Sequence, residues 1–185
     1  MTLTALDPVT ALVVVDLQAG VTGRETAHPI PDVLAANRLL LDAFRAKGLP
    51  VVLVNVDAGA PGRTDLRPEG GSFAMPPEAT EFAPELDRQP SDHVVTKKTW
   101  GSFTGTDLDE WLRAQGATEV VVTGVATTAG VESTARHAHE LGYHVVLATD
   151  AMTDMSPAGH DYAVSSVFPR IGQSATAAEI VALLP

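Results

Sequence analysis

The sequence contains no cysteine among its 185 residues. Without thiols the chain cannot form disulfide bonds, thiolate zinc sites or iron–sulfur clusters. A cysteine nucleophile is excluded for the same reason. Any catalysis must therefore depend on other side chains.

Positive charge is also scarce. The chain has 12 Lys and Arg against 23 Asp and Glu, which gives a net charge of −11. A surface this acidic repels phosphate backbones, so we expect no nucleic-acid partner. No apolar run approaches the roughly 18 residues of a membrane span, and residues 1–8 lack the basic and apolar regions of a signal peptide. We therefore expect a cytoplasmic protein with no membrane partner.

Motifs for cofactors and metals are missing as well. The sequence has no Walker loop and no dinucleotide fingerprint. His137 and His139 lie two residues apart in a predicted helix and point in different directions, which makes them a poor metal-binding pair. We expect neither a cofactor nor a metal ion.

Apolar runs and helical stripes alternate along the chain, which is long enough for one domain over residues 1–185. Continuous apolar runs are typical of parallel strands that are buried on both faces. We predict strands at 11–16, 50–56, around 94–95, 119–124 and 143–149. Helices are predicted from Pro31 to before Gly48, after Thr106 as cap, at 133–141 and 158–168, and in the tail to residue 184, where Thr176 and Glu179 have capping-box spacing. This alternation predicts right-handed crossovers and a three-layer α/β/α sandwich.

Residues 57–92 do not fit the pattern, because they are rich in glycine and proline. Loops of this length in a compact domain are commonly functional lids or disordered segments. Three interpretations stay open at this point: a flexible surface excursion, a lid over the site, or an extension that embraces a neighbouring subunit.

Three features converge on one edge of the predicted sheet. Asp16 ends the first strand, Lys97 follows the third, and the glycine-flanked turn 124–130 joins the fourth strand to its helix. In open parallel sheets, ligands bind beyond the carboxyl ends of the strands, where the strand order reverses. Each feature alone has a plainer interpretation: a turn cap, a solvated surface lysine and a tight connection. Together they predict an acid and a cation that tune one another's pKa beside an anion pocket.

These residues resemble a known family. The motifs Val14-Val-Asp-Leu-Gln18, Lys97-Lys-Thr-Trp-Gly-Ser-Phe103 and Gly124-Val-Ala-Thr-Thr-Ala-Gly-Val-Glu-Ser-Thr134 are similar to those of the isochorismatase-like, or cysteine hydrolase, superfamily. The similarity covers nearly the whole chain and is weakest over residues 57–92. It implies a mainly parallel, Rossmann-like sheet of six strands and assembly into a homodimer or a higher homo-oligomer.

The chain departs from the family pattern at the nucleophile. The family triad is Asp, Lys and Cys, and by resemblance its members here are Asp16, Lys97 and Gly130, which stands at the cysteine position. The resemblance thus places the chain in a subgroup with glycine in place of the catalytic cysteine. The thiol mechanism of the family amidases does not carry over. Isochorismatases proper hydrolyse a vinyl ether without a thiol, through one carboxylic acid of raised pKa and a cation that holds the substrate.

The resemblance also implies the substrate contacts. The N–H groups of Ala129 and Gly130 would form part of an anion pocket. A cis peptide bond common in the family would fall at Val125–Ala126. The remaining predicted substrate-binding residues are Thr127, Thr128, Trp100 and Phe103, with core packing as the plainer role for Phe103.

Two functions follow from this interpretation. The first is hydrolysis of a small carboxylated molecule, at a vinyl ether or a related C–O or C–N bond, by acid–base catalysis through Asp16 and Lys97. The alternative is a pseudoenzyme that binds a small molecule and has lost the chemistry with the thiol. A third reading uses Thr127, Thr128 or Ser133 as the nucleophile, but the sequence shows no obvious histidine base for it.

Overall fold

A computed structural model describes residues 3–185. Its sheet has six strands, all parallel, in the spatial order β3-β2-β1-β4-β5-β6. They are β1 (Thr10–Val15), β2 (Val51–Val56), β3 (His93–Lys97), β4 (Glu119–Val125), β5 (His144–Thr153) and β6 (Gln173–Ala175). The order reverses between β1 and β4, which is the doubly wound topology. The predicted fold class is confirmed.

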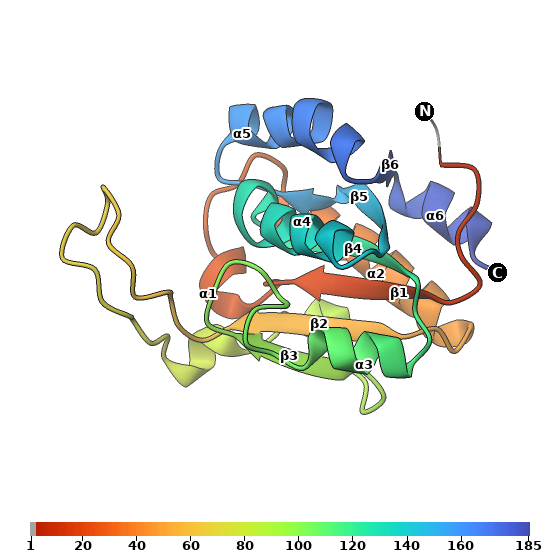
Figure 1. Cartoon of the computed structure of the whole chain (residues 1–185), viewed down its shortest axis with the longest axis horizontal. Coiled ribbons are helices and arrows are strands. Elements are labelled where there is room, and N and C mark those ends of the chain that lie inside the picture. Colours follow the sequence, from red (N-terminus) through yellow and green to blue (C-terminus); the bar gives the residue numbers. More distant parts are fainter. Residues whose placement is uncertain (1–2) are drawn as a thin grey trace.

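Helices cover both faces of the sheet (Figure 1). They are α1 (Ala19–Thr22), α2 (Ile30–Ala46), α3 (Leu108–Ala114), α4 (Glu132–Glu140), α5 (Pro157–Tyr162) and α6 (Ala177–Leu183). Every residue of β1 is buried, and its alternate side chains enter two separate cores. Val13 packs in the core with Leu112 of α3 and Ala135 of α4, whereas Leu12 packs with Phe44 of α2 and Ile180 of α6. The apolar run of β1 is therefore explained by burial on both faces.

Several element boundaries differ from the predictions. The fifth strand was predicted to end at 149 but extends to Thr153, because an irregularity between Val122 and Gly124 of β4 lets β5 resume pairing at Met152. The cap of α3 is Asp107 and not the predicted Thr106, because α3 begins at Leu108. The Thr106 hydroxyl donates to the Ser102 carbonyl and accepts from the Leu108 N–H only at 3.4 Å. The predicted helix at 158–168 is α5 followed by a π-helical turn, η4 (Ala163–Val167), and a 3-10 turn, η5 (Phe168–Arg170).

The segment between β2 and β3 has two parts. Residues 57–75, here named the arm, extend away from the body of the molecule and are drawn in yellow in Figure 1. The remainder returns over the body through two 3-10 turns, η1 (Pro77–Thr80) and η2 (Pro84–Leu86). Sequence patterns predicted neither turn.

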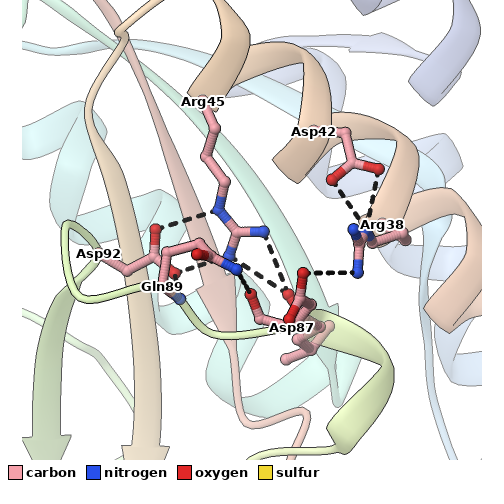
Figure 2. A network of polar contacts seen from close by, with 7 residues as sticks. Arg38, Asp42, Arg45, Asp87, Gln89 and Asp92 are labelled. Atoms are coloured by element: carbon pink, nitrogen blue, oxygen red, sulfur yellow. Dashed lines mark hydrogen bonds and ion pairs between the residues drawn. The ribbon is translucent and has the colours of Figure 1, made fainter.

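The return segment is fastened to α2 by a polar network (Figure 2). The Arg45 guanidinium donates to both carboxylate oxygens of Asp92, at 3.1 and 2.6 Å, and to the Leu86 carbonyl. The Asp92 side chain is only 1% exposed and that of Arg45 is 14% exposed, so the charge pair is largely buried. A more exposed pair, Arg38 with Asp87, lies beside it. Together these contacts fix the end of the excursion before β3 begins.

No helix within residues 3–185 is long and apolar enough to cross a membrane.

Candidate active site

Asp16 and Lys97 lie together at the carboxyl edge of the sheet. Asp16 directly follows β1, where its backbone turns sharply with φ of 54°, a conformation that non-glycine residues adopt mainly at constrained positions. Lys97 is the last residue of β3. Its ammonium Nζ donates to Asp16 Oδ2 at 2.7 Å and to the Thr99 carbonyl at 3.2 Å. The two residues are 81 positions apart in sequence, and the fold brings their charged groups into contact.

Both members of this pair are buried, with 6% of Asp16 and 2% of Lys97 exposed. Burial raises the pKa of Asp16 from an ordinary 3.8 to about 6, although the Lys97 ammonium opposes the change by its charge and its hydrogen bond. Within residues 3–185, the second carboxylate oxygen, Oδ1, has no hydrogen-bond partner. Asp16 is thus a buried carboxyl group whose proton affinity suits acid–base chemistry near neutrality, with one oxygen paired to Lys97 and the other buried without a partner in the described part of the chain.

Gly130 faces this carboxylate. A Cβ atom placed on Gly130 would lie 3.0 Å from Asp16 Oδ2 and 3.4 Å from the Val125 carbonyl oxygen. The position that the sequence resemblance assigns to the family cysteine is therefore beside the Asp16–Lys97 pair. Because Gly130 has no side chain, this residue supplies no nucleophile to the Asp16–Lys97 pair.

The turn after β4 has the expected cis peptide bond between Val125 and Ala126. It continues into a π-helical turn, η3 (Thr127–Val131), before α4. The expectation that the Ala129 N–H is free for an anion is wrong, because it donates to the Ala126 carbonyl at 3.0 Å. The Val131 N–H donates to the same oxygen. The Ala129 N–H, which was predicted to face the ligand, is therefore used in a hydrogen bond within the turn itself.

A cavity of about 540 Å³ opens onto the Asp16–Lys97 pair. Of the sequence-predicted site residues, it is lined by Asp16, Lys97, Trp100, Val125, Ala126, Ala129 and Gly130. Trp100 is 68% exposed and forms part of the open rim. Phe103 instead packs in the core against Tyr143, with its ring also near His137.

Thr127 and Thr128 do not line the cavity either. The Thr127 hydroxyl pairs with His160 Nδ1 at 2.9 Å, and both residues are buried behind the turn. Burial lowers the pKa of His160, which favours the neutral ring. The Thr128 N–H and hydroxyl both donate to Asp154 Oδ2 at 2.7 Å. A histidine partner for a threonine hydroxyl therefore does exist, but this pair lies away from the cavity and fastens the turn.

Sequence reasoning missed most of the cavity's outer wall. Arg24 follows α1, and Arg63, Leu66, Arg67 and Phe73 belong to the arm. No periodic pattern marks them, since the arm is neither helix nor regular strand. The one available signal was the position of two arginines within a glycine- and proline-rich loop.

Gln18, the last residue of the motif that contains Asp16, holds the base of the arm. Its side-chain amide donates to the carbonyl oxygens of Val56 and Ala79, both at 2.9 Å, and its Oε1 accepts from the Val56 N–H at 2.7 Å. Gln18 is fully buried. It therefore ties the end of β2, where the arm begins, to the turn η1, which follows the arm.

Among residues 3–185, the one group of three side chains spaced for a metal ion is Asp7, Glu119 and His144. Glu119 and His144 begin β4 and β5, so this group lies at the amino edge of the sheet, opposite the cavity. It is not part of the candidate active site.

Comparison with known proteins identifies relatives over nearly the whole chain. A family model described as the isochorismatase domain matches residues 10–179. An isochorismatase family protein of Bacillus subtilis, YwoC, is 42% identical over 179 residues, which cover 93% of this chain and 92% of the relative. The ureidoacrylate amidohydrolase RutB of Stutzerimonas stutzeri is 32% identical over 80% of this chain and 71% of its own length. A solved structure of an isochorismatase family protein from Burkholderia thailandensis has 43% identity and a TM-score of 0.91, with 97% of each chain covered.

Proposed function

This chain belongs to the isochorismatase family of hydrolases, and we propose that it hydrolyses a small carboxylated molecule without a covalent enzyme intermediate. The scissile bond is a vinyl ether or a related C–O or C–N bond. Asp16 acts as the acid–base residue. Lys97 stabilises the negative charge of the Asp16 carboxylate and binds the substrate.

One observation carries the proposal. Asp16 lines the cavity beside Lys97 and keeps a proton to higher pH than an ordinary carboxyl group. A carboxylic acid in this state can donate its proton to a bound substrate. On a vinyl ether, the Asp16 proton is transferred to the terminal carbon of the enol, and the electron pair of the double bond forms the new C–H bond. Water then adds to the oxocarbenium carbon and returns one proton to the Asp16 carboxylate. The hemiketal breaks its C–O bond as the hydroxyl proton passes to the departing oxygen, which gives a ketone and an alcohol.

Lys97 stabilises the carboxylate that Asp16 becomes after it gives up its proton. The contact of 2.7 Å between Nζ and Oδ2 is already formed in the resting site, so no rearrangement is needed when the charge appears. The buried ammonium also attracts an anionic substrate. Because Gly130 supplies no thiol, water is the nucleophile in this scheme.

Amide hydrolysis is the second form of the same proposal. The ureidoacrylate amidohydrolase relative bears a name that specifies a C–N bond. In that chemistry Asp16 would first act as a base toward the attacking water. The two forms predict opposite pH dependence, since an acid is active when protonated and a base when ionised.

The test is a screen of enol ethers, amides and ureides with Asp16→Asn as the diagnostic variant. Loss of a general acid or base should lower kcat/KM by at least about 100-fold. Asp65→Asn, which removes an exposed carboxylate of the arm, is the matched control. For a vinyl ether, kcat/KM should fall as the pH rises through about 6, whereas for an amide it should rise.

Two outcomes contradict the proposal. One is an Asp16→Asn variant that retains turnover within about threefold of the wild type. The other is a ligand that stabilises the protein against heat but yields no product across the screen, which would favour a binding protein of the same fold.

A further inference from the structure

The cavity is strongly positive in a protein that is otherwise acidic. Of the 12 Lys and Arg residues in the chain, four line this cavity: Arg24, Arg63, Arg67 and Lys97. Of the 23 Asp and Glu residues, only Asp16 lines it. Lys97 is paired with Asp16, whereas within residues 3–185 the three arginines form no ion pair. An unpaired set of cations around one cavity indicates an anionic ligand.

The arm separates its charges by sign. Four charged side chains lie near its tip, at Arg63, Asp65, Arg67 and Glu69. Arg63 and Arg67 line the cavity, although Arg63 is also exposed to solvent, whereas the exposed Asp65 and Glu69 do not line it. A solvated loop with no role in binding has no reason to sort its charges in this way. The sorting therefore favours a function for the arginines at the cavity.

The arm is held in shape by hydrogen bonds between its two legs. The Gly59 N–H donates to the Phe73 carbonyl at 3.1 Å, and the Gly71 N–H donates to the Pro61 carbonyl at 2.9 Å. At the tip, Thr64 and Arg67 exchange two backbone hydrogen bonds of 3.1 and 3.0 Å. The arm is thus an irregular hairpin whose tight turn lies between the two arginines, and this arrangement limits the entropy lost when they bind.

Two glycines, Gly59 and Gly70, leave room for the contacts that position the arginines. The Phe73 ring lies directly against Gly59, where a Cβ atom would collide with it. The Arg67 guanidinium carbon lies 5.2 Å from the centroid of this ring, a cation–π arrangement. The stem of Arg63 crosses the opposite leg at Gly70, whose added Cβ would lie 3.0 Å from Arg63 Cγ. Packing across the hairpin therefore orients both side chains.

The remaining outer wall is apolar. Leu66 is 95% exposed, and Phe73 and Trp100 are also exposed, yet all three line the cavity. Large apolar side chains in such positions are typical of surfaces that contact a ligand. The outer cavity thus combines apolar walls with guanidinium groups.

We propose that the arm selects the substrate, and that it selects an organic anion with an apolar body whose carboxylate is bound by Arg63 and Arg67. This inference rests on the proposed function, because it assumes that the cavity at Asp16 is the substrate site. It adds the class of substrate and two residues that determine specificity. The arginines act in binding and not in proton transfer.

The experiment is calorimetric titration with benzoate and trans-cinnamate, and with benzamide and cinnamamide as uncharged counterparts. The wild type should bind both acids at millimolar or lower concentration and the amides at least tenfold more weakly. The double variant Arg63→Gln/Arg67→Gln should bind the acids at least tenfold more weakly than the wild type. Arg170→Gln, an exposed arginine far from the cavity lining, is the control and should stay within twofold. Phe73→Leu keeps the charge but removes the ring under Arg67, and should weaken binding about threefold.

Three results would overturn the inference: amides that bind as tightly as the acids, a double variant within twofold of the wild type, or no saturable binding of either acid up to about 10 mM. Failure here can be separated from failure of the proposed function through Asp16→Asn. If that variant loses turnover while the arginine variants bind and turn over normally, only the inference about the arm fails. If it keeps turnover while the arginine variants lose the acids, only the proposed catalysis fails.

Discussion

Replacing Asp16 by asparagine should remove a pH-dependent contribution that lowers the free energy of unfolding. In the folded protein, burial holds the pKa of Asp16 near 6, whereas the unfolded chain releases this proton near 3.8. The folded state therefore binds the proton more tightly. As the pH rises through this interval, the free energy of unfolding falls, and the loss is nearly complete by about pH 7.

The size of the effect follows from the two pKa values. A difference of about 2.2 pH units corresponds to about 3 kcal/mol over the full interval. Between pH 4.5 and 7.5, about 2 kcal/mol of this should be measurable, because part of the titration has already occurred at pH 4.5. Asparagine cannot titrate, so the variant lacks this contribution. It also leaves Lys97 without a charged partner, which lowers the stability of the variant by a further amount.

The assay is urea denaturation of the wild type and Asp16→Asn at several pH values from 4.5 to 7.5. The difference in unfolding free energy, variant minus wild type, should increase by about 2 kcal/mol with rising pH. The exposed Asp65→Asn variant controls for the general change in net charge. A difference for Asp16→Asn that is constant to within about 0.5 kcal/mol would show that burial does not raise the pKa, and the argument for an acid would lose its basis.

Three further predictions concern other parts of the structure. Asp92→Ala should lower the free energy of unfolding by about 3 kcal/mol, measured by urea denaturation, since it leaves the partly buried Arg45 guanidinium with only the Leu86 carbonyl as a partner within residues 3–185. Gly130→Cys should lower the free energy of unfolding by about 1–3 kcal/mol, because the new side chain crowds Asp16. It also creates the one thiol of the chain, and the pH dependence of its alkylation rate reports on the adjacent carboxylate and ammonium. Thr176→Ala should cost about 1 kcal/mol in thermal unfolding, because the capping box with Glu179 is formed at α6.

The inner part of the site could be predicted because it depends on topology. Buried runs identified β1 and β4 as parallel strands, and Asp16 and the turn after β4 follow directly from their ends. Once strands are parallel, their carboxyl ends meet at one edge, so a residue at the end of β3 comes near as well. The family resemblance supplied the roles. Sequence separation is no obstacle when the sheet itself sets the geometry.

The outer part of the site could not be predicted, because it depends on contacts with no repeating pattern. Arg67 can lie over the Phe73 ring because Gly59 leaves room for that ring. Such a contact has no recognisable pattern in a single sequence. The same is true of the Ala129 N–H, whose use within the π-helical turn depends on local backbone geometry. The length of β5 was missed because its irregular pairing with β4 interrupts the expected register.

The clamp at Gln18 has a consequence for how this scaffold can vary. One buried amide fixes the residue where the arm departs and the turn that follows it, so the separation of these two points does not depend on what lies between them. The entropy of closing a connection grows only slowly with its length. Insertions, deletions or wholesale exchange of residues 57–75 should thus leave the sheet and its buried charge pair intact. The sequence of the arm can therefore change while the rest of the domain stays the same, and new substrate specificities can arise there at little cost to folding.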